Sequence, residues 1–480
     1  MADQQWRMTN QHQEEDNDEE AVPVSPVGQY FNSSALCIYI IGVLEFQVPL
    51  DESQAIPLLQ RLFLPINPRF SSIMVEDSSG DKRWKKVDVN LKDHVNIPLF
   101  PEFNSMKPYD KYFTDYLSRI AIEKLPENRP LWEIHVVNYP TSGAASSLIF
   151  KLHHALGDGY SLMGALLSCL QRADDPSLPL SFPSLKPSKS ANKNFFSTFS
   201  LVMSSAYNTV VDFYWSMLKS TIIEDDKTPI RSGFEGTEVR PLTISTMTFS
   251  IDQIKLIKSR LGVTINDVIT GIIFYGTRLY MQDINKKSSS ANSTALVLLK
   301  TRNTEGYQSI DEMLNSKAKG PWGNRISFLH VPIPKLEHDR ISNPLEFIWE
   351  AHNIIKRKKK IFSVPITGIL LEMEGKFRGH EAVAKHIHGT LSKSSTVITN
   401  LIGPTQPMSL ANHPVKGLYF TLAGGPESLV ISVMSYMGVL RVTLKAEKYF
   451  IDEHKLNSRI KCAFETIFDA ALEFSQQAKT

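Results

Sequence analysis

The sequence predicts a two-domain protein of the α/β (α+β) class, and three observations support this prediction. The 480 residues exceed what one ordinary core holds, because domains usually contain about 100–200 residues. Hydrophobic residues make up 42% of the chain and charged residues 21%, as in folded globular proteins. Segments with strand character alternate with segments of helical periodicity in both halves.

In the first half, apolar and β-branched runs predict strands, and apolar residues at helical spacing predict helices. The predicted strands are Ala35–Phe46, Trp84–Val89, Ile97–Phe100, Pro130–Val137 and Ser147–Leu152. The predicted helices are Asp110–Ile122 and a segment that starts at Ser161. In the second of these helices, Leu162, Ala165, Leu166 and Cys169 recur every three or four residues, which is typical of an amphipathic helix.

The second half repeats this alternation. Its predicted strands are Leu242–Ile251, Ala295–Leu299, Ile326–Ile333, Ser395–Asn400, Leu429–Ser435 and Val439–Ala446. Its predicted helices are Ile251–Arg260, a segment that begins at Thr264 and runs through Tyr280, and Ile451–Phe474. Thr264 and Asp267 have the spacing of a capping box, which favours a helix start at this point.

Composition also predicts the domain boundaries. Residues 173–194 are rich in proline and serine, as linkers are. We therefore expect a first domain at 23–185, a linker at 186–238 and a second domain at 239–480. Residues 1–22 hold no secretory signal, because acidic residues stand where one would need apolar residues. They are predicted to be a disordered acidic tail, with a partner-binding arm as the alternative.

No segment is apolar enough to cross a bilayer, but two segments could touch one. Phe195–Leu218 is aromatic-rich and interrupted by polar residues, which suits a helix on a membrane surface or a helix between two domains. Lys356–Leu371 joins a basic run to an apolar stretch. This pair could meet anionic headgroups or the phosphates of a large cofactor, or could be a solvated helix end.

The net charge and the cysteine content limit the binding partners and the cell compartment that we expect. Lys+Arg 52 against Asp+Glu 50 gives a net charge of +2, so no global field would attract a nucleic acid. Cys37, Cys169 and Cys462 allow at most one internal disulfide and include no CxxC pair. This favours a reducing compartment or the cytosolic side of a membrane.

The segment His153–Gly159 is the strongest candidate for chemistry. It joins a buried strand to an amphipathic helix, its two glycines permit a tight turn, and Asp158 lies four residues after His154. A neutral imidazole can accept a proton at physiological pH, so His154 could deprotonate a hydroxyl, amine or thiol that attacks an activated acyl group. Two satisfied polar histidines are one alternative. A metal site of His153, His154 and Asp158 is less favoured, because neighbours on a strand point to opposite faces.

Motifs of other enzyme classes are incomplete. The chain has no GxSxG and no GxGxxG motif, Ala384 stands where HExxH needs its second histidine, and Phe377 stands where a P-loop needs Ser or Thr. His386 and His388 could bind a metal from one face of a strand, although a surface or core role is the simpler interpretation. The chain thus offers a general base without an accompanying protein nucleophile.

Five ordered blocks resemble those of the plant wax ester synthase/diacylglycerol acyltransferases. They are Ser25–Phe31 (SPVGQYF), Pro130–Glu133 (PLWE), His153–Gly159 (HHALGDG), Asn266–Asp267 (ND) and Asn400–Pro404 (NLIGP). The third block matches the HHxxxDG motif, which acyl-CoA-dependent acyltransferases share with condensation domains of nonribosomal peptide synthesis. The resemblance runs from about residue 23 to residue 475.

The resemblance implies a two-domain fold of the chloramphenicol acetyltransferase type with a tunnel between the domains. Acyl-CoA would enter from one side and a long-chain fatty alcohol or diacylglycerol from the other. His154 would be the general base for direct attack of the hydroxyl on the thioester, without an acyl-enzyme. Acyl-CoA would be a substrate, and neither a metal nor a cofactor is implied.

The resemblance also suggests roles for other residues. Asp158 would pair with an arginine of the second domain, for which Arg302 is the candidate, although the proline that often follows that arginine is absent. Asn266 would orient the acyl carbonyl or stabilise the oxyanion, or would be only a polar residue of the first helical turn. Structural or tunnel-lining roles are expected for His153, Gly159, Arg302, Asn400 and Gly403.

For the cell, the resemblance implies wax ester synthesis, including cuticular wax, and triacylglycerol synthesis at a membrane lipid surface. The expected location is the cytosolic face of the endoplasmic reticulum, with the plasma membrane as the alternative. Two other functions stay open. One is a soluble acyltransferase of specialised metabolism, whose DFGWG block the segment Gly320–Asn324 matches poorly. The other is a non-catalytic lipid-binding protein with the same fold.

Overall fold

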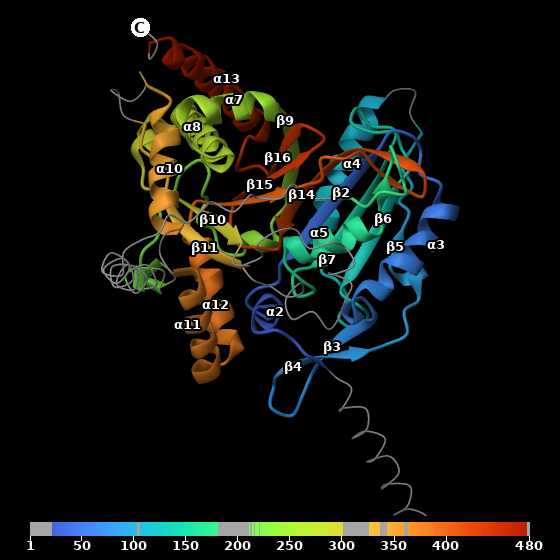
Figure 1. Cartoon of the computed structure of the whole chain (residues 1–480). Helices are drawn as coiled ribbons and strands as arrows, with labels where there is room; N and C mark the ends of the chain where they lie inside the picture. The colour runs from blue at the N-terminus through green and yellow to red at the C-terminus, as the bar shows by residue number, and fades with distance from the viewer. Residues whose placement is uncertain are drawn as a thin grey trace, which may run out of the picture.

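The computed structural model describes residues 22–102, 106–180, 211, 214–215, 217–219, 221–300, 326–336, 343–359 and 363–477. Two large β-sheets dominate this part of the chain, together with a small sheet of three strands. The two large sheets lie side by side, each with its own helices (Figure 1). This arrangement confirms the predicted two-domain α/β class.

The first large sheet is built around two buried strands of the N-terminal half. Its strands in spatial order are β5 (Val95–Asn96), β6 (Trp132–Val137), β7 (Ser146–His153), β2 (Tyr39–Phe46), β14 (His413–Ala423), β13 (Met408–Leu410) and β8 (Gln171–Arg172). All eight residues of β7 are buried, which explains its unbroken apolar run. Helix α5 (Gly159–Ser168) follows β7, and α4 (Met106–Ile122) packs against β9 (Leu242–Ser250), a strand of the second large sheet.

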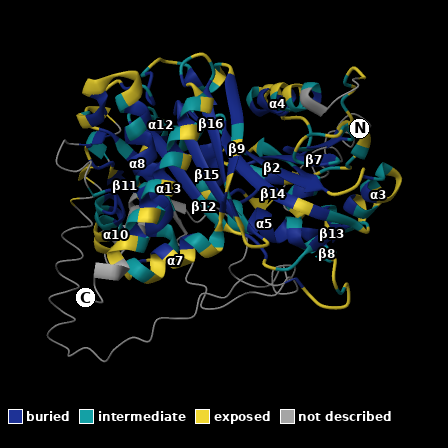
Figure 2. Ribbon diagram, turned by 90° about the horizontal axis from the view of Figure 1, so that it is seen from above, coloured by how far each residue is buried: buried dark blue, intermediate teal, exposed yellow. Residues whose placement is uncertain are grey.

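The second large sheet and its helices form the other domain. Its strands in spatial order are β11 (Ile326–Pro332), β10 (Thr294–Lys300), β12 (Thr396–Ile402), β15 (Leu429–Tyr436), β16 (Val439–Glu447) and β9 (Leu242–Ser250). The helices that share its apolar core are α7 (Ile251–Leu261), α8 (Ile265–Ile284), α10 (Glu346–Lys359) and α13 (Glu453–Gln477). The sheet strands are buried, and the exposed residues gather on the outer helices and turns (Figure 2).

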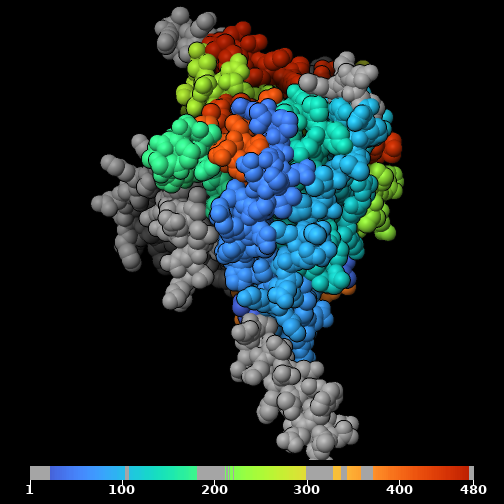
Figure 3. All heavy atoms as spheres, turned by 90° about the vertical axis from the view of Figure 1, so that its right-hand side faces the viewer, coloured from blue at the N-terminus to red at the C-terminus, as the bar shows by residue number. Residues whose placement is uncertain are grey.

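The C-terminal half of the chain contributes two strands to the first sheet. Strands β13 and β14 follow β12 in sequence but pair within the first sheet, where β14 lies antiparallel to β2 along eight residue pairs. The chain returns to the second sheet at Gly424, whose φ of 82° is left-handed. A Cβ at Gly424 would collide with the carbonyl oxygen of Cys37, so only glycine fits this return. In Figure 3, blue and cyan spheres of the N-terminal half cover most of one face, with orange spheres of the C-terminal half set among them.

The smaller elements gather at one end of the molecule (Figure 1). They are the sheet β1 (Val22–Pro23), β4 (Lys82–Lys86) and β3 (Ser72–Glu76), with the helices α2 (Pro26–Phe31), α11 (Ser363–Arg378) and α12 (His380–Ser392). Helix α3 (Glu52–Leu62) lies on the outer side of the first sheet. None of the helices in the described ranges has the length and apolar character that a bilayer crossing requires.

Most predicted strands and helices are confirmed to within a few residues, and the capping box of Thr264 and Asp267 is present at the start of α8. The strand predicted at Ile97–Phe100 is wrong, because pairing with β6 ends at Asn96. Helix α3 was not predicted, because Pro57 in its interior suggests a break. The segment Phe195–Leu218 lies mostly outside the described residues, as does part of Lys356–Leu371.

Candidate active site

The two adjacent histidines lie where β7 ends. His153 is the last residue of β7, and the backbone N–H of His154 donates at 2.8 Å to the carbonyl of Ile38, the residue before β2. The His154 side chain is only 4% exposed. Its ring packs against Phe31 of α2, with 4.6 Å between the ring centroids and 53° between the planes. The sequence placed His154 correctly at a strand end, but it did not indicate the aromatic neighbour.

His153 is bonded through both ring nitrogens. Its Nδ1 accepts the backbone N–H of Ala155 at 3.1 Å, and its Nε2 lies 3.4 Å from the Sγ of Cys37. The ring of Tyr39 meets it edge-on, with centroids 5.4 Å apart. Burial lowers the pKa of His153 to about 3, and the neighbouring His154 adds to this effect. His153 is therefore neutral, with its proton on Nε2, and it holds the turn rather than exchanging protons.

Asp158 closes the same turn as the N-cap of α5. Its Oδ1 accepts the backbone N–H of Ser161 at 2.9 Å and the hydroxyl of Ser161 at 3.0 Å. Aspartate is favoured here because its carboxylate satisfies N–H groups that the first helical turn leaves unpaired. Arg302, the predicted partner of Asp158, lies outside the described residues.

Two contacts fix the turn from outside the motif. Arg69 donates through Nη1 to the carbonyl of Leu156 at 2.9 Å, and burial lowers the pKa of this guanidinium. No sequence pattern marked Arg69, which follows a proline in a short 3₁₀ helix. On the other side, a Cβ at Gly159 would lie 2.9 Å from Cδ1 of Leu401 in β12. The HHxxxDG turn therefore meets the second sheet, and a glycine permits that approach.

The remaining motif residues join α8 to β12. Asn400 of β12 donates through Nδ2 to Oδ1 of Asn266, in the first turn of α8. The neighbouring side chain of Asp267 caps the helix, because it accepts the backbone N–H of Thr264 at 2.8 Å and pairs with Nδ1 of His352 at 2.7 Å. The two residues of the ND block thus have different contacts: the Asn266 amide faces β12, and the Asp267 carboxylate caps the helix.

Gly403 directly follows β12, where the chain passes very close to β15. Its N–H donates to the carbonyl of Ser435 at 3.0 Å, and a Cβ at this position would collide with the same oxygen. The family resemblance implies that Gly403 shapes a tunnel wall. The observed contact gives a steric reason for glycine at this strand end.

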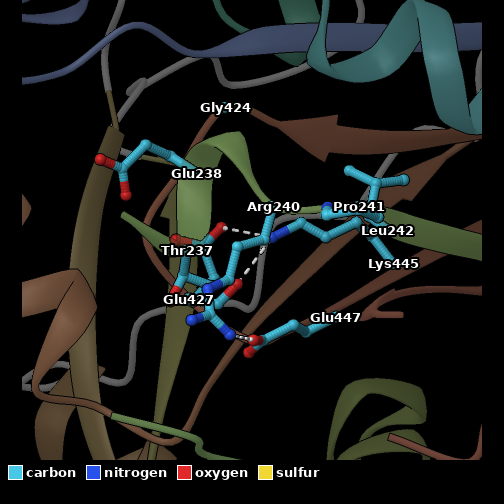
Figure 4. A pocket seen from close by; sticks show the side chains of 10 residues that line it. Thr237, Glu238, Arg240, Pro241, Leu242, Gly424, Glu427, Lys445 and Glu447 are labelled. Carbon is cyan, nitrogen blue, oxygen red and sulfur yellow. Dashed lines mark hydrogen bonds and ion pairs between the residues drawn. The ribbon is translucent and has the colours of Figure 1, made fainter. Parts of the chain in front are cut away.

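A small cavity lies beside the chain return at Gly424 (Figure 4). Its free volume of about 10 Å³ admits one water molecule, so it cannot hold an acyl chain. Glu427 and Lys445 line it, and Lys445 Nζ donates to the backbone carbonyl of Glu427 at 2.7 Å. Burial raises the pKa of Glu427 and lowers that of Lys445. A second, open depression of about 570 Å³ between β9 and α13 is lined by His454 and Lys461, and His154 lines neither space.

His386 and His388 do not form a metal site. The interpretation that they share a strand face is wrong, because both lie on α12, where residues two apart do not face each other. His386 instead contacts Oε2 of Glu374 through Nδ1 at 2.9 Å. Within the described residues, no group of three or more His, Cys, Asp and Glu side chains is placed to hold a metal ion.

Comparison with known proteins matches the chain to one family. Residues 68–269 match the model of the wax ester synthase/diacylglycerol acyltransferase catalytic domain, and residues 322–468 match that of the WS/DGAT C-terminal domain. Wax ester synthase/diacylglycerol acyltransferase 4 of Arabidopsis thaliana is 29% identical over 474 residues, covering 93% of this chain and 90% of that protein. Number 11 of the same organism is 29% identical over 479 residues, covering 95% and 96%.

Solved structures show the same fold at low sequence identity. The wax ester synthase/diacylglycerol acyltransferase from Marinobacter aquaeolei VT8 aligns over 94% of this chain and 100% of its own, with a TM-score of 0.58 and 15% identity. The starter condensation domain of rhizomide synthetase RzmA aligns over 94% of each chain, with a TM-score of 0.54 and 10% identity. Because the two family models together match well over half of its residues, this chain belongs to the wax ester synthase/diacylglycerol acyltransferase family of acyltransferases.

Proposed function

We propose that this chain transfers a long-chain acyl group from acyl-CoA to the hydroxyl of a fatty alcohol, and also to diacylglycerol. The observation that carries the proposal is the HHxxxDG turn, which holds His154 at the end of β7 and meets β12 of the second sheet at Gly159. The names of the Arabidopsis relatives support these two acceptor classes. The RzmA condensation domain was solved in complex with C8-CoA, which supports an acyl-CoA donor on this fold.

In the proposed reaction His154 is the general base. An unprotonated ring nitrogen removes the proton of the acceptor hydroxyl while that oxygen attacks the carbonyl carbon of the thioester. The new C–O bond forms, the C–S bond breaks, and the proton on His154 passes to the departing sulfur of CoA. No covalent enzyme intermediate is needed, and no oxidant, metal or cofactor takes part.

Asn266 is the proposed stabiliser of the oxyanion. Asn400 donates to Oδ1 of Asn266, and this bond sets the orientation of the Asn266 amide. The Nδ2 group of Asn266 is then the end that would donate to the thioester oxygen. Removing one such donor typically lowers kcat by about 10²–10³-fold. We expect Asn266→Ala to show a loss of this size, and the lost bond with Asn400 to lower the free energy of unfolding by only about 0.5–1.5 kcal/mol. An Asn266→Ala enzyme with full turnover would remove Asn266 from the mechanism.

The proposed site of action is a lipid surface, at the cytosolic face of the endoplasmic reticulum or, alternatively, at the plasma membrane. Long-chain alcohols and diacylglycerol reside in bilayers, so an enzyme that uses them benefits from contact with one. The end of α11 offers exposed apolar side chains, with Phe377 82% exposed and Met373 47% exposed, beside Lys376. The tunnel between the domains stays a prediction.

The test is ester formation by the purified full chain. Palmitoyl-CoA is incubated with hexadecanol or with diacylglycerol in phospholipid vesicles, and the wax ester or triacylglycerol is measured. The wild type is expected to form ester, and His154→Ala is expected to form almost none. His454→Ala is the matched control, because this side chain is 92% exposed on α13. No ester from the wild type, or equal ester from His154→Ala, would refute the proposed function.

A further inference from the structure

Helix α2 is a short element whose start is well determined by sequence. Ser25 is its N-cap and accepts the backbone N–H of Gly28 through its hydroxyl at 3.3 Å, and Pro26 occupies the first helical position. Its last four residues, Gly28–Phe31, are all buried. A six-residue helix cannot be stable alone, so its position depends on what it packs against.

One side of α2 is pressed against the HHxxxDG turn. A Cβ at Gly28 would lie 2.9 Å from Cγ1 of Val24 and 3.4 Å from the carbonyl oxygen of Ala155. Phe31 is 2% exposed, and its ring covers the ring of His154 at 4.6 Å between centroids. The helix therefore contacts both the backbone of the turn and the imidazole.

The other side of α2 is held by the C-terminal half. The hydroxyl of Tyr30 donates to the carbonyl of Leu371 in α11 at 3.4 Å, and its ring lies 5.7 Å from that of His380 at the start of α12. A Cβ at Gly375 would lie 3.0 Å from this hydroxyl. Burial, with Glu372 and Glu374 nearby, raises the pKa of Tyr30 to about 12, so the phenol stays protonated and can donate. Helix α2 is thus wedged between α11–α12 and His154.

We propose that Phe31 is a positioning residue that fixes the ring orientation of His154. This inference rests on the proposed function, in which His154 is the general base. A histidine ring rotates about two side-chain bonds, and proton transfer requires one of those orientations. The Phe31 ring lies against the imidazole, with 4.6 Å between the ring centroids, and rotation of the imidazole would bring the two rings into collision. A base that is held in this way need not be reoriented in each turnover, which raises kcat without improving substrate binding.

The test compares Phe31→Leu with Phe46→Leu. Phe46 is fully buried in the same core, but it lies at the far end of β2: Tyr39 pairs with His153, whereas Phe46 pairs with Ser146. We expect Phe31→Leu to lower kcat about tenfold or more and to change the KM for palmitoyl-CoA less than twofold. Phe46→Leu is expected to lower stability and to leave kcat within about twofold. Phe31→Met, which fills more of the volume without a flat ring, is the second variant if Phe31→Leu does not fold.

A chemical readout is independent of turnover. The rate at which diethylpyrocarbonate modifies His154, measured by mass spectrometry of its peptide, is expected to rise at least fivefold in Phe31→Leu and to stay unchanged in Phe46→Leu. Equal kcat values in the two variants together with equal modification rates would overturn the positioning role. Ester formation by His154→Ala at the wild-type rate would instead overturn the proposed function, and the modification rates would still show whether Phe31 covers the ring.

Discussion

The two faces of the sheet at the end of β7 hold neighbouring histidines by different means. On one face, His153 is fixed by hydrogen-bonding groups from Ala155 and Cys37 and by the edge of Tyr39. On the other, the ring of His154 is covered by the apolar ring of Phe31. His153 is the last residue of β7 and lies beside Tyr39 of one apolar cluster, whereas His154, in the turn that follows, packs against Phe31 of another. The contacts of His153 support a structural role for it, and the proposed function assigns the proton transfer to His154.

The largest expected difference between the two faces is in activity. We expect His154→Ala to lower kcat by about 10²–10⁴-fold, which is the usual contribution of a positioned general base. His153→Leu is expected to lower the free energy of unfolding by about 1–3 kcal/mol, because the Ala155 N–H loses its buried acceptor. Initial rates and chemical denaturation of both variants would measure this contrast. A His153→Leu enzyme that is fully stable but inactive would contradict the structural role of His153.

The next effect is the dependence of stability on pH. The pKa of His153 is about 3 in the folded protein and about 6.5 in an unfolded chain, so between these values the unfolded state binds the extra proton. The stability that the neutral His153 ring contributes is fully present above pH 6.5. As the pH falls toward 3, the free energy of unfolding decreases by at most about 1.4 kcal/mol per pH unit. We expect His153→Leu to flatten the curve of unfolding free energy against pH in this window. His454→Ala, which changes an exposed histidine, is expected to keep the wild-type slope.

A smaller effect is expected at the N-cap that follows the two histidines. Asp158→Ala removes the acceptor for the Ser161 N–H, which should cost about 0.5–2 kcal/mol of unfolding free energy. Asp158→Asn keeps a capping oxygen and is expected to cost only a few tenths of a kcal/mol in capping. If both variants lose activity while only Asp158→Ala loses stability, the negative charge itself acts on the His154 face. Denaturation midpoints and initial rates distinguish the two contributions.

The smallest effect on activity is expected at Cys37, on the His153 face. Cys37→Ala removes the sulfur that faces Nε2 of His153 and should cost about 1 kcal/mol. Burial raises the pKa of this thiol, so it is protonated and a poor nucleophile at neutral pH. The kcat of Cys37→Ala is expected to stay within about twofold of the wild type. A larger loss of kcat, at unchanged stability, would show that the two faces are coupled.

The sequence was sufficient for the features that depend on local pattern. The strand that ends at His153, the helix after Asp158 and the capping box of Thr264 follow from periodicity and spacing within about ten residues. The position of His154 at the strand end could be predicted for the same reason.

Contacts between distant segments could not be predicted. Nothing in the local pattern shows that β14 pairs with β2, that Phe31 covers His154, or that Arg69 binds the carbonyl of Leu156. These contacts join segments far apart in the chain, and hydrophobic periodicity specifies a buried face without naming its partner. The error at His386 and His388 has a different origin: an alternation of only three residues fits a strand face as well as a turn of helix.

The placement of β14 has a consequence for biosynthesis. While the ribosome has made only the first 180 residues, β2 can pair with β7 on one edge, but its other edge lacks the strand that covers it in the native state. That strand ends at Ala423, so the open edge persists until nearly nine-tenths of the polypeptide has been translated. An exposed apolar edge is prone to pairing with other chains. The edge of β2 is open to such pairing over a longer stretch of synthesis than that of β9, which pairs with β16 of its own half.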